Sequence, residues 1–500
     1  MGFFGLIDEF LKLMDPWLIL VMLGSTGLGV VIGALPGLTA TMGIALLTGL
    51  TYKLPTVYTF TILMGVYVGA IYGGSISAIL LNIPGTASAA ATALDGHKLA
   101  KQGNAINAIK LTRSASIIGT LLGCLALAFV APPLTKIALM FTSPEYFMLA
   151  LFGVMICGTI VSSDLPIKGW IGGLIGLIFS FVGMDKLHGV SRFDLGITDL
   201  MSGVSIIPAM IGFYAVPEVI KAFTRNEKFS INTDAGKGEK IQLFKELWKV
   251  KRTIVQSALI GIGIGALPGV GEDVAAWVSY DTAKKTSKQG HLFGTGVYEG
   301  AIAPEVGNNA AIGGAIIPLL TLAVPGSPPA AVLLGALMLH NIRPGPMIMR
   351  ENPTFINHFA ALLFLATIAL YIMGVLLAKP MVQILKVPVV YLMPIVASLS
   401  FIGAYAINNR QFDLIIVLLF GVLGYILDKM QYSAAPIVLG LILGNMIDEN
   451  FRRTLIVSSG DPMLFLSRPI SLIFFIIVLY TIISQFVKKK PKKQPVVPKT

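Results

Sequence analysis

The chain has 500 residues, of which 55% are hydrophobic and only 12% are charged, and its mean hydropathy is +0.81. A soluble protein of this length needs more charge to cover its surface. The composition therefore excludes a soluble globular protein and predicts an all-α polytopic membrane protein. The net charge of +12 lies largely in loops and at the C-terminus, where the cytoplasmic preference of basic residues explains it without nucleic acid.

The chain is predicted to begin with an amphipathic helix on the membrane surface, over residues 1–16. This segment has no basic region of the kind that precedes a cleavable signal. Apolar stretches able to cross a bilayer follow over residues 17–222 and resume over residues 253–487, and these ranges form two transmembrane halves. Because several stretches are short or interrupted by glycine and proline, roughly ten to twelve crossings with re-entrant pieces are expected.

Two segments are strongly basic. Residues 223–252 separate the halves, and residues 488–500 form the end of the chain. Both are expected on the cytoplasmic side because Lys and Arg concentrate there in membrane proteins, and the tail is expected to be disordered.

The two halves are related by an internal repeat. GALPG at Gly33–Gly37 recurs 232 positions later, and GVYVGAI at Gly65–Ile71 is echoed 231 positions later by GVYEGAI at Gly296–Ile302. Pro84-Gly85 recurs 241 positions later, which assigns about ten additional residues to the second copy after GVYEGAI. The first copy follows an acidic flank and the second a basic one, so we expect the inverted topology found in many secondary transporters.

An apolar-Pro-Gly triplet interrupts each half twice, at residues 35–37, 83–85, 267–269 and 324–326. Proline ends a helix and glycine allows the chain to turn, so re-entrant or broken helices are predicted there. A helix that restarts inside the membrane presents free N–H groups to an anion, whereas the alternative is an ordinary interfacial loop. The candidate substrate-binding residues at the breaks are Pro36, Gly37, Thr39, Pro84, Gly85, Thr86, Pro325, Gly326 and Ser327.

The second copy carries polar side chains between apolar segments, at Glu299, Glu305, Asn308 and Asn309. At an offset of 231 the first copy has only small or apolar residues, and this asymmetry favours function over a requirement of the fold. We predict that the two glutamates, together with Asp273, bind the coupling cation, either Na⁺ or H⁺.

The substrate is expected at Asn308, Asn309 and three polar residues of the first copy, Ser75, Ser77 and Asn82. For the two serines, close helix packing is the competing interpretation.

The sequence contains no P-loop, no H-E-x-x-H and no G-x-S-x-G motif. It therefore predicts no catalytic residue, no cofactor and no enzyme activity.

Three long blocks resemble a known family. They are GALPGLTATMGIALL from Gly33, YVGAIYGGSISAILLNIPGTASAAATALDGHKLAKQG from Tyr67, and EGAIAPEVGNNAAIGGAIIPLLTLAVPGSP from Glu299. They are similar to the large membrane subunit, TctA, of the tripartite tricarboxylate transporters. Glu272-Asp273 departs from the family, which more usually has small residues there.

The resemblance implies a permease in the bacterial inner membrane that works with a small membrane subunit and a periplasmic solute-binding protein. It also implies uptake of di- or tricarboxylates or related organic anions, driven by an ion gradient instead of ATP. The alternatives are a stand-alone carrier for another small anion and, from a different class, a membrane scaffold or enzyme.

Overall fold

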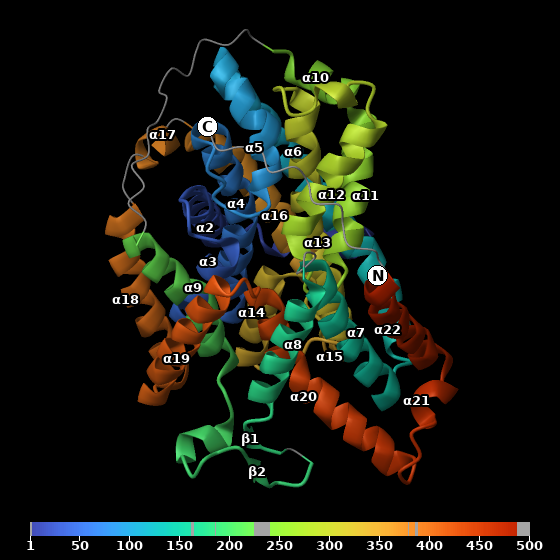
Figure 1. Cartoon of the computed structure of the whole chain (residues 1–500). Helices are drawn as coiled ribbons and strands as arrows, with labels where there is room; N and C mark the ends of the chain where they lie inside the picture. The colour runs from blue at the N-terminus through green and yellow to red at the C-terminus, as the bar shows by residue number, and fades with distance from the viewer. Residues whose placement is uncertain are drawn as a thin grey trace.

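The computed structural model describes residues 3–161, 165–185, 187–224, 241–378, 380–385 and 389–487. This part of the chain is helical apart from two short antiparallel strands, β1 (Gly183–Met184) and β2 (Ser191–Arg192), which confirms the all-α class. The helices form one elongated bundle with α10 (Leu243–Lys249) at one end and β1–β2 at the other (Figure 1). Most of the basic linker, residues 225–240, and the tail over 488–500 lie outside the described residues.

The first half of the chain forms helices whose order is interrupted at the two predicted breaks. They are α1 (Phe3–Lys12), α2 (Pro16–Ala34), α3 (Ala40–Thr51), α4 (Thr56–Leu81), α5 (Ala89–Leu99), α6 (Ala105–Ala138), α7 (Ser143–Val161), α8 (Pro166–Ser180) and α9 (Ile206–Thr224).

The second half repeats this order. After α10 come α11 (Lys251–Gly265), α12 (Gly271–Thr286), α13 (Tyr298–Leu322), α14 (Pro328–Leu339), α15 (Ile348–Glu351), α16 (Phe355–Leu376), α17 (Pro380–Ile384), α18 (Val389–Asn408), α19 (Gln411–Lys429), α20 (Ala434–Val457), α21 (Leu464–Ser467) and α22 (Pro469–Val487).

Within the described ranges, eight helices are long and apolar enough to cross a membrane, and four shorter apolar helices accompany them. The chain is therefore a multi-pass membrane protein. Two of the four shorter helices, α3 and α14, follow directly after Pro-Gly breaks. The crossing number of ten to twelve and the inverted orientation of the halves stay predictions.

Helices α4 and α13 form the centre of the bundle. In α13 every residue from Glu299 to Leu322 is buried, and α4 is buried along most of its length. Helix α4 packs closely on α2, and α13 on α11, at glycine residues. A Cβ added at Gly33 of α2 would lie 1.9 Å from the Ala70 carbonyl oxygen, and one at Gly265 of α11 would lie 2.4 Å from the Ala311 oxygen. Glycine is needed at both contacts because the backbones approach without room for a side chain.

These contacts fix the register of the repeat and correct one prediction. Ala70 and Ala311 are 241 positions apart, as are the left-handed residues that end α4 and α13, Asn82 (φ 59°) and Ala323 (φ 57°). Since the first breaks are 232 positions apart and these residues 241, the second copy has nine additional residues, which precede α13 and do not follow GVYEGAI. Glu305 corresponds to Met64 and not to a residue near Gly73, so the GVYxGAI echo is not structurally equivalent. Closely packed helices reuse small residues every few positions, which allows such an out-of-register match.

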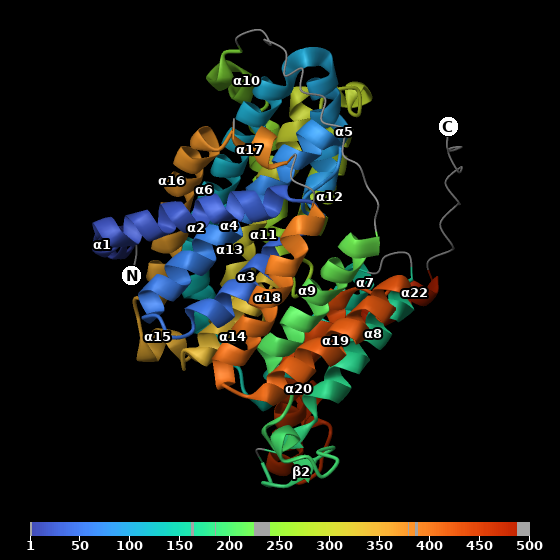
Figure 2. The same cartoon turned by 90° about the vertical axis from the view of Figure 1, so that its left-hand side faces the viewer.

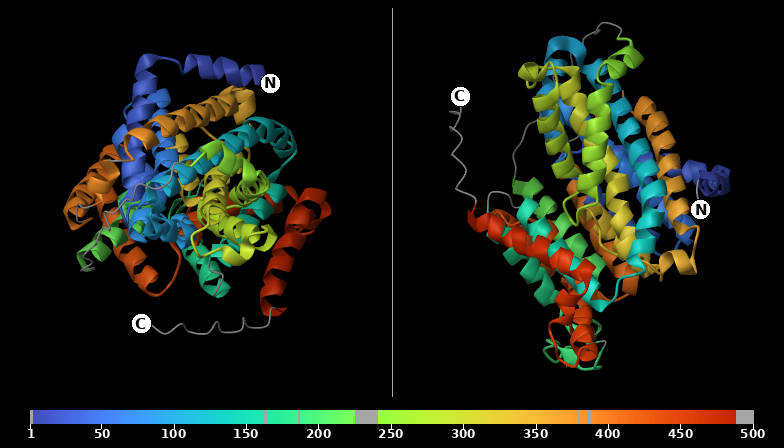
Figure 3. Two further views of the ribbon diagram at one scale, coloured as in Figure 1. Left: turned by 90° about the horizontal axis from the view of Figure 1, so that it is seen from above. Right: turned by 90° about the vertical axis from the view of Figure 1, so that its right-hand side faces the viewer.

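The two halves interlock instead of forming separate bodies. Helix α6 packs along α13, while α16 packs on α2 and α4. Near the end of each half, a helix packs on a helix of the other half: α20 packs on α8, and α9 packs on α19 (Figure 2). The predicted halves, residues 17–222 and 253–487, are thus separate in the sequence but packed together in space. Seen from above, α1 and α22 lie at the periphery of the bundle (Figure 3).

Contacts of charged side chains also join the halves outside this core, as two examples show. On α5, Asp95 is buried and accepts the backbone N–H groups of Gly294, Gly296 and Val297, which lie immediately before α13. Beside β1, Asp185 accepts a hydrogen bond of 2.7 Å from Arg452 of α20. The Arg452 guanidinium holds the pKa of the Asp185 carboxyl well below its usual range.

Candidate functional site

All four Pro-Gly segments separate helices, as the sequence predicts. The two breaks of each half pack backbone to backbone. A Cβ at Gly85 would lie 1.9 Å from the Gly33 carbonyl oxygen, and one at Gly326 would lie 1.9 Å from the Gly265 oxygen. In each half the second break is also tied to the helix before it, since the Gly85 N–H donates to Gly74 at 3.4 Å and the Gly326 N–H to Ala315 at 3.3 Å.

The helices that restart after the breaks meet at one cavity of about 360 Å³. The beginnings of α3, α5, α12 and α14, which are the four helices that restart after a break, all contribute to its wall, and the beginning of α20 adds a fifth. Its lining residues are Thr39, Ala40, Thr41, Ile71, Thr86, Ala87, Val161, Tyr214, Gly269, Val270, Glu272, Asp273, Val274, Trp277, Pro328, Pro329, Ser433, Ala434 and Ala435.

Polar side chains hold these helix beginnings in place. Thr39 accepts the N–H of Met42 at 3.2 Å at the start of α3, and Ser433 accepts the N–H of Ala435 at 3.4 Å at the start of α20. Helix N-termini carry partial positive charge and unpaired N–H groups. Five of them around one cavity create a field that favours an anion.

Two carboxylates oppose that field. Glu272 and Asp273 lie in the first turn of α12, and both line the cavity. Glu272 accepts a hydrogen bond from the Tyr67 hydroxyl. The lining residues named above include no Lys, Arg or His. The Tyr214 hydroxyl is buried and has no hydrogen-bond partner among the described residues, so one donor remains for a ligand.

A smaller cavity of about 190 Å³ adjoins the first and shares four of its lining residues. It contains Lys221 of α9, whose ammonium group lies 2.8 Å from Glu218 and 2.9 Å from Asp428. A larger cavity, of about 770 Å³, lies beside β1–β2 and is not lined by any of the four breaks. We therefore place the candidate site where the breaks converge.

The structure brings only some of the predicted site residues to this cavity. Thr39, Thr86 and Asp273 line it. Ser327 lies 2.8 Å from the Tyr67 hydroxyl that holds Glu272. Pro36, Gly37, Pro84, Gly85, Pro325 and Gly326 shape the breaks but are not among the lining residues.

Five predicted substrate ligands lie elsewhere. Asn82 ends α4 and lines a separate groove with His97 and Lys98. Ser75 and Ser77 donate to carbonyl groups of their own helix, at 2.8 and 3.1 Å, which agrees with the packing interpretation. The remaining two, Asn308 and Asn309, are buried in α13 and contact each other at 2.6 Å.

Two of the three predicted cation ligands are also outside the cavity. Glu305 is fully buried and accepts hydrogen bonds from Thr92 at 2.6 Å and Ser116 at 2.8 Å. Glu299, at the start of α13, accepts hydrogen bonds from Thr253 and Ser287. Each carboxylate joins α13 to its neighbours through hydroxyl groups, and neither is among the residues that line the cavity.

Sequence reasoning missed Tyr214 and Ser433. Ser433 carries a signal that would have found it, since a serine before Ala-Ala-Pro is typical of a helix N-cap. Tyr214 carries none, because only the packing of α9 against the repeat brings it to the cavity. Glu272 was noted as unusual, but it was not assigned to the site.

A family model matches most of the chain. Residues 18–439 match the family described as "Tripartite tricarboxylate transporter TctA family". The chain is 34% identical over 448 residues, or 89% of its length and 88% of the relative's, to an Agrobacterium vitis protein described as "Uncharacterized 52.8 kDa protein in TAR-I ttuC' 3'region". It is 37% identical over 208 residues, or 42% of its length and 86% of the relative's, to the same organism's "Uncharacterized protein in TAR-II ttuC' 3'region". No solved structure matches. The chain therefore belongs to the tripartite tricarboxylate transporter TctA family.

Proposed function

We propose that this chain is the permease subunit of a cation-coupled importer of organic carboxylates and that the 360 Å³ cavity is its substrate site. The observation that carries the proposal is the convergence of five helix beginnings on one cavity in a member of a transporter family. Helix N-termini bind carboxylates through backbone N–H groups without needing a basic side chain. Broken helices of this kind hold the substrate in other secondary transporters.

The substrate in this proposal is a small di- or tricarboxylate, because the cavity is small and its donors come from several directions. The hydroxyls of Thr39 and Thr86 lie at the beginnings of α3 and α5, and that of Tyr214 comes from α9. These donors are able to contact separate carboxylate groups of one molecule. Alternating access then exposes the cavity to each side of the membrane in turn.

The partners and the setting follow from the family and are part of the proposal. A periplasmic solute-binding protein delivers the carboxylate, and a small membrane subunit completes the complex in the bacterial inner membrane. The basic linker and the C-terminal tail lie in the cytoplasm. An ion gradient, of Na⁺ or H⁺, drives uptake.

Uptake into proteoliposomes tests the proposal. The complex is reconstituted with its cognate binding protein, and a panel of labelled di- and tricarboxylates is offered under separate Na⁺ and pH gradients. We expect uptake of at least one carboxylate that requires both the binding protein and a cation gradient. Uptake without the binding protein supports the stand-alone carrier instead, and no uptake of any carboxylate contradicts the proposal.

Substitutions in the cavity separate a carrier from a scaffold. Thr39→Val combined with Thr86→Val should reduce uptake by about fivefold to 150-fold, because each lost hydroxyl removes a hydrogen bond of about 0.5–1.5 kcal/mol. Thr48→Val is the matched control, since Thr48 lies on α3 but donates to Ile44 of its own helix. Wild-type uptake by the folded double variant contradicts the assignment of the cavity.

A further inference from the structure

Glu272 is the end of a hydrogen-bonded chain of two hydroxyl groups, which come from different halves of the protein. The Tyr67 hydroxyl of α4 donates to Glu272 and also lies 2.8 Å from the Ser327 hydroxyl oxygen before α14. Ser327 in turn accepts the N–H of Ala330 at 3.2 Å. Tyr67 has one proton and gives it to Glu272, so Ser327 must donate its own proton to Tyr67. Every hydroxyl in the chain then points toward an ionised Glu272.

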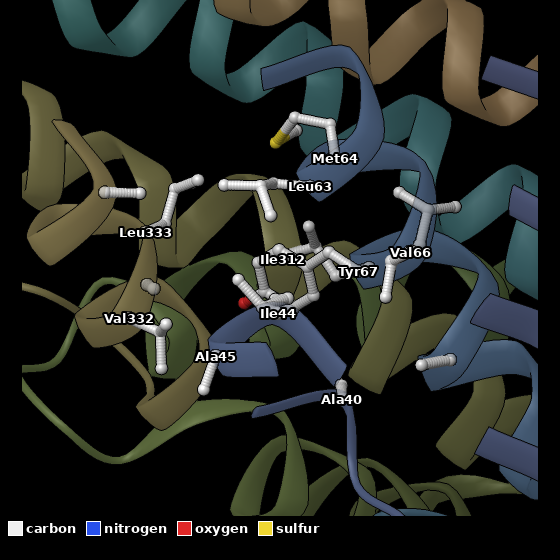
Figure 4. Close-up of a cluster of buried hydrophobic side chains, with 14 of the residues drawn as sticks. Ala40, Ile44, Ala45, Leu63, Met64, Val66, Tyr67, Ile312, Val332 and Leu333 are labelled. Carbon is white, nitrogen blue, oxygen red and sulfur yellow. The ribbon is translucent and has the colours of Figure 1, made fainter. Parts of the chain in front are cut away.

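The three side chains of this hydrogen-bonded series, Tyr67, Ser327 and Glu272, are buried, and Figure 4 shows the Tyr67 ring among apolar side chains that include Ile44 and Ile312. Glu272 is nevertheless a lining residue of the cavity, so one side of it faces the proposed substrate. A buried carboxylate with one exposed approach is suited to gaining and losing a single small ion.

A bound carboxylate substrate conflicts with an ionised Glu272. The lining residues offer no basic side chain to balance three or more negative charges. Asp273, the other titratable group beside Glu272, is itself acidic, and Lys221 of the adjoining cavity is paired with Glu218 and Asp428. Substrate binding therefore favours a state in which Glu272 has lost its charge.

Charged groups on the neighbouring helices are already engaged. Asp95 of α5 binds Tyr280 and the backbone before α13, and Glu299 and Glu305 of α13 bind hydroxyl groups. The basic residues of α11, Lys251 and Arg252, lie at its start, whereas Glu272 follows its end.

We propose that Glu272 is the coupling site of the transporter and that the coupling ion is a proton. This inference rests on the proposed function and deepens it, since it names the ion and the residue that carries it. A proton from solution binds the Glu272 carboxylate to form a carboxylic acid. The acid then donates to the Tyr67 oxygen, Tyr67 donates to Ser327, and no covalent bond other than the new O–H changes.

The contacts of Glu272 favour a proton over Na⁺. The two side chains that contact it or its partner, Tyr67 and Ser327, are hydroxyls arranged as donors. A metal cation needs several oxygen atoms that present lone pairs to one point. A hydroxyl chain instead serves either protonation state, because its hydrogens turn around when the carboxylate becomes an acid.

The test compares exchange with accumulation in the reconstituted complex. Exchange of labelled for unlabelled substrate across the membrane needs no net proton movement, whereas accumulation driven by a pH gradient does. Glu272→Gln imitates the protonated acid, so we expect exchange to persist and accumulation to be lost. Asp281→Asn is the matched control, because Asp281 lies on the same helix but is exposed and paired with Lys285. This control should keep both activities.

A second variant tests the hydroxyl chain. Tyr67→Phe removes the donor that stabilises ionised Glu272, so uptake should persist to higher pH, with its alkaline limb shifted by about one pH unit. Unchanged pH dependence in this folded variant overturns the role of the chain.

Three results overturn the inference while leaving the proposed function intact. The first is accumulation by Glu272→Gln at the wild-type level under a pH gradient. The second is wild-type accumulation that follows a Na⁺ gradient and ignores the pH gradient. The third is loss of exchange together with accumulation in Glu272→Gln, which assigns Glu272 to substrate binding. If the wild-type complex moves no carboxylate at all, it is the proposed function that fails.

Discussion

The two halves of the chain share a backbone design but differ in the chemistry placed on it. In both, glycines 52 and 61 positions apart bring the two breaks together, Gly33 with Gly85 and Gly265 with Gly326. After the first break, however, the first half continues with Thr39-Ala40-Thr41 and the second with Gly271-Glu272-Asp273. The backbone that both halves share builds a cavity from broken helices. The acidic pair Glu272-Asp273 occurs in the second half alone, as a single coupling site requires.

The central helices show the same division. In the corrected register the polar residues of α13 correspond to Tyr58, Met64, Tyr67 and Val68 of α4. Where the second half has the amide of Asn308, the first half has Tyr67. The longer side chain of Tyr67 ends in a hydroxyl that reaches Glu272, just after the first break of the second half. Tyr67 and Glu272 thus meet, although they come from different halves.

The largest expected effect tests the shared backbone. Gly85→Ala and Gly326→Ala should each prevent folding, because the added methyl group would lie 1.9 Å from a carbonyl oxygen of the partner glycine. The measurement is the yield of monodisperse protein in detergent and its thermal unfolding. Gly24→Ala and Gly263→Ala are matched controls on α2 and α11, where an added Cβ meets nothing within 4 Å. A well-folded Gly326→Ala protein beside an unfolded Gly85→Ala protein would break the equivalence of the halves.

These breaks are also the part of the site that the sequence predicts best. A proline followed by glycine removes a backbone donor and also allows the chain to turn, so the four Pro-Gly pairs mark the ends of helices without knowledge of the fold. Proline alone does not, since α13 continues through Pro304 and Pro318. The family resemblance and the membrane class follow equally directly from composition and long motifs.

The rest of the site depends on packing between distant segments. Tyr214 and Ser433 reach the cavity only because α9 and α20 each pack on the opposite half. The register of the repeat was predicted wrongly because six matching residues, mostly small and apolar, recur at different heights of two closely packed helices. Glu305 illustrates the same limit, since its charge suggested function while its hydroxyl partners on α5 and α6 are invisible in the sequence.

The next largest effect exchanges chemistry between the halves. Asp273 corresponds to Thr41, and Asp273→Thr should lower uptake about tenfold to a hundredfold, because it removes a carboxylate from the cavity wall, and contacts of charged groups are worth about 1.5–3 kcal/mol. Initial uptake rates in proteoliposomes provide the measurement. Thr41→Ala is the control in the first half and should stay within about threefold of wild type, since it removes only an uncharged group. Equal losses in the two variants would show that the acidic half has no special role.

Glu305 tests whether the acidic groups of the second half share one function. Glu305→Gln should cost about 1–3 kcal/mol of unfolding free energy, because one of the donors Thr92 and Ser116 then faces an amide N–H₂ group. Accumulation driven by a pH gradient should survive, in contrast to Glu272→Gln. The two readouts are denaturation in detergent and accumulation in proteoliposomes. Retained exchange with lost accumulation would return the coupling role to Glu305.

The smallest expected effect compares one cap from each half. Thr39 and Ser327 both accept an N–H at 3.2 Å at the start of a helix, so Thr39→Ala and Ser327→Ala should each lower the unfolding free energy by about 1 kcal/mol. Ser327→Ala should have a second effect that Thr39→Ala lacks, because Ser327 also donates to Tyr67. Its loss weakens the hydrogen bond from Tyr67 to ionised Glu272, which moves the alkaline limb of uptake to higher pH. Similar stability losses combined with a pH shift in only one variant would separate the shared backbone from the chemistry of the second half. A shift in both would mean that the caps influence the cavity through helix position alone.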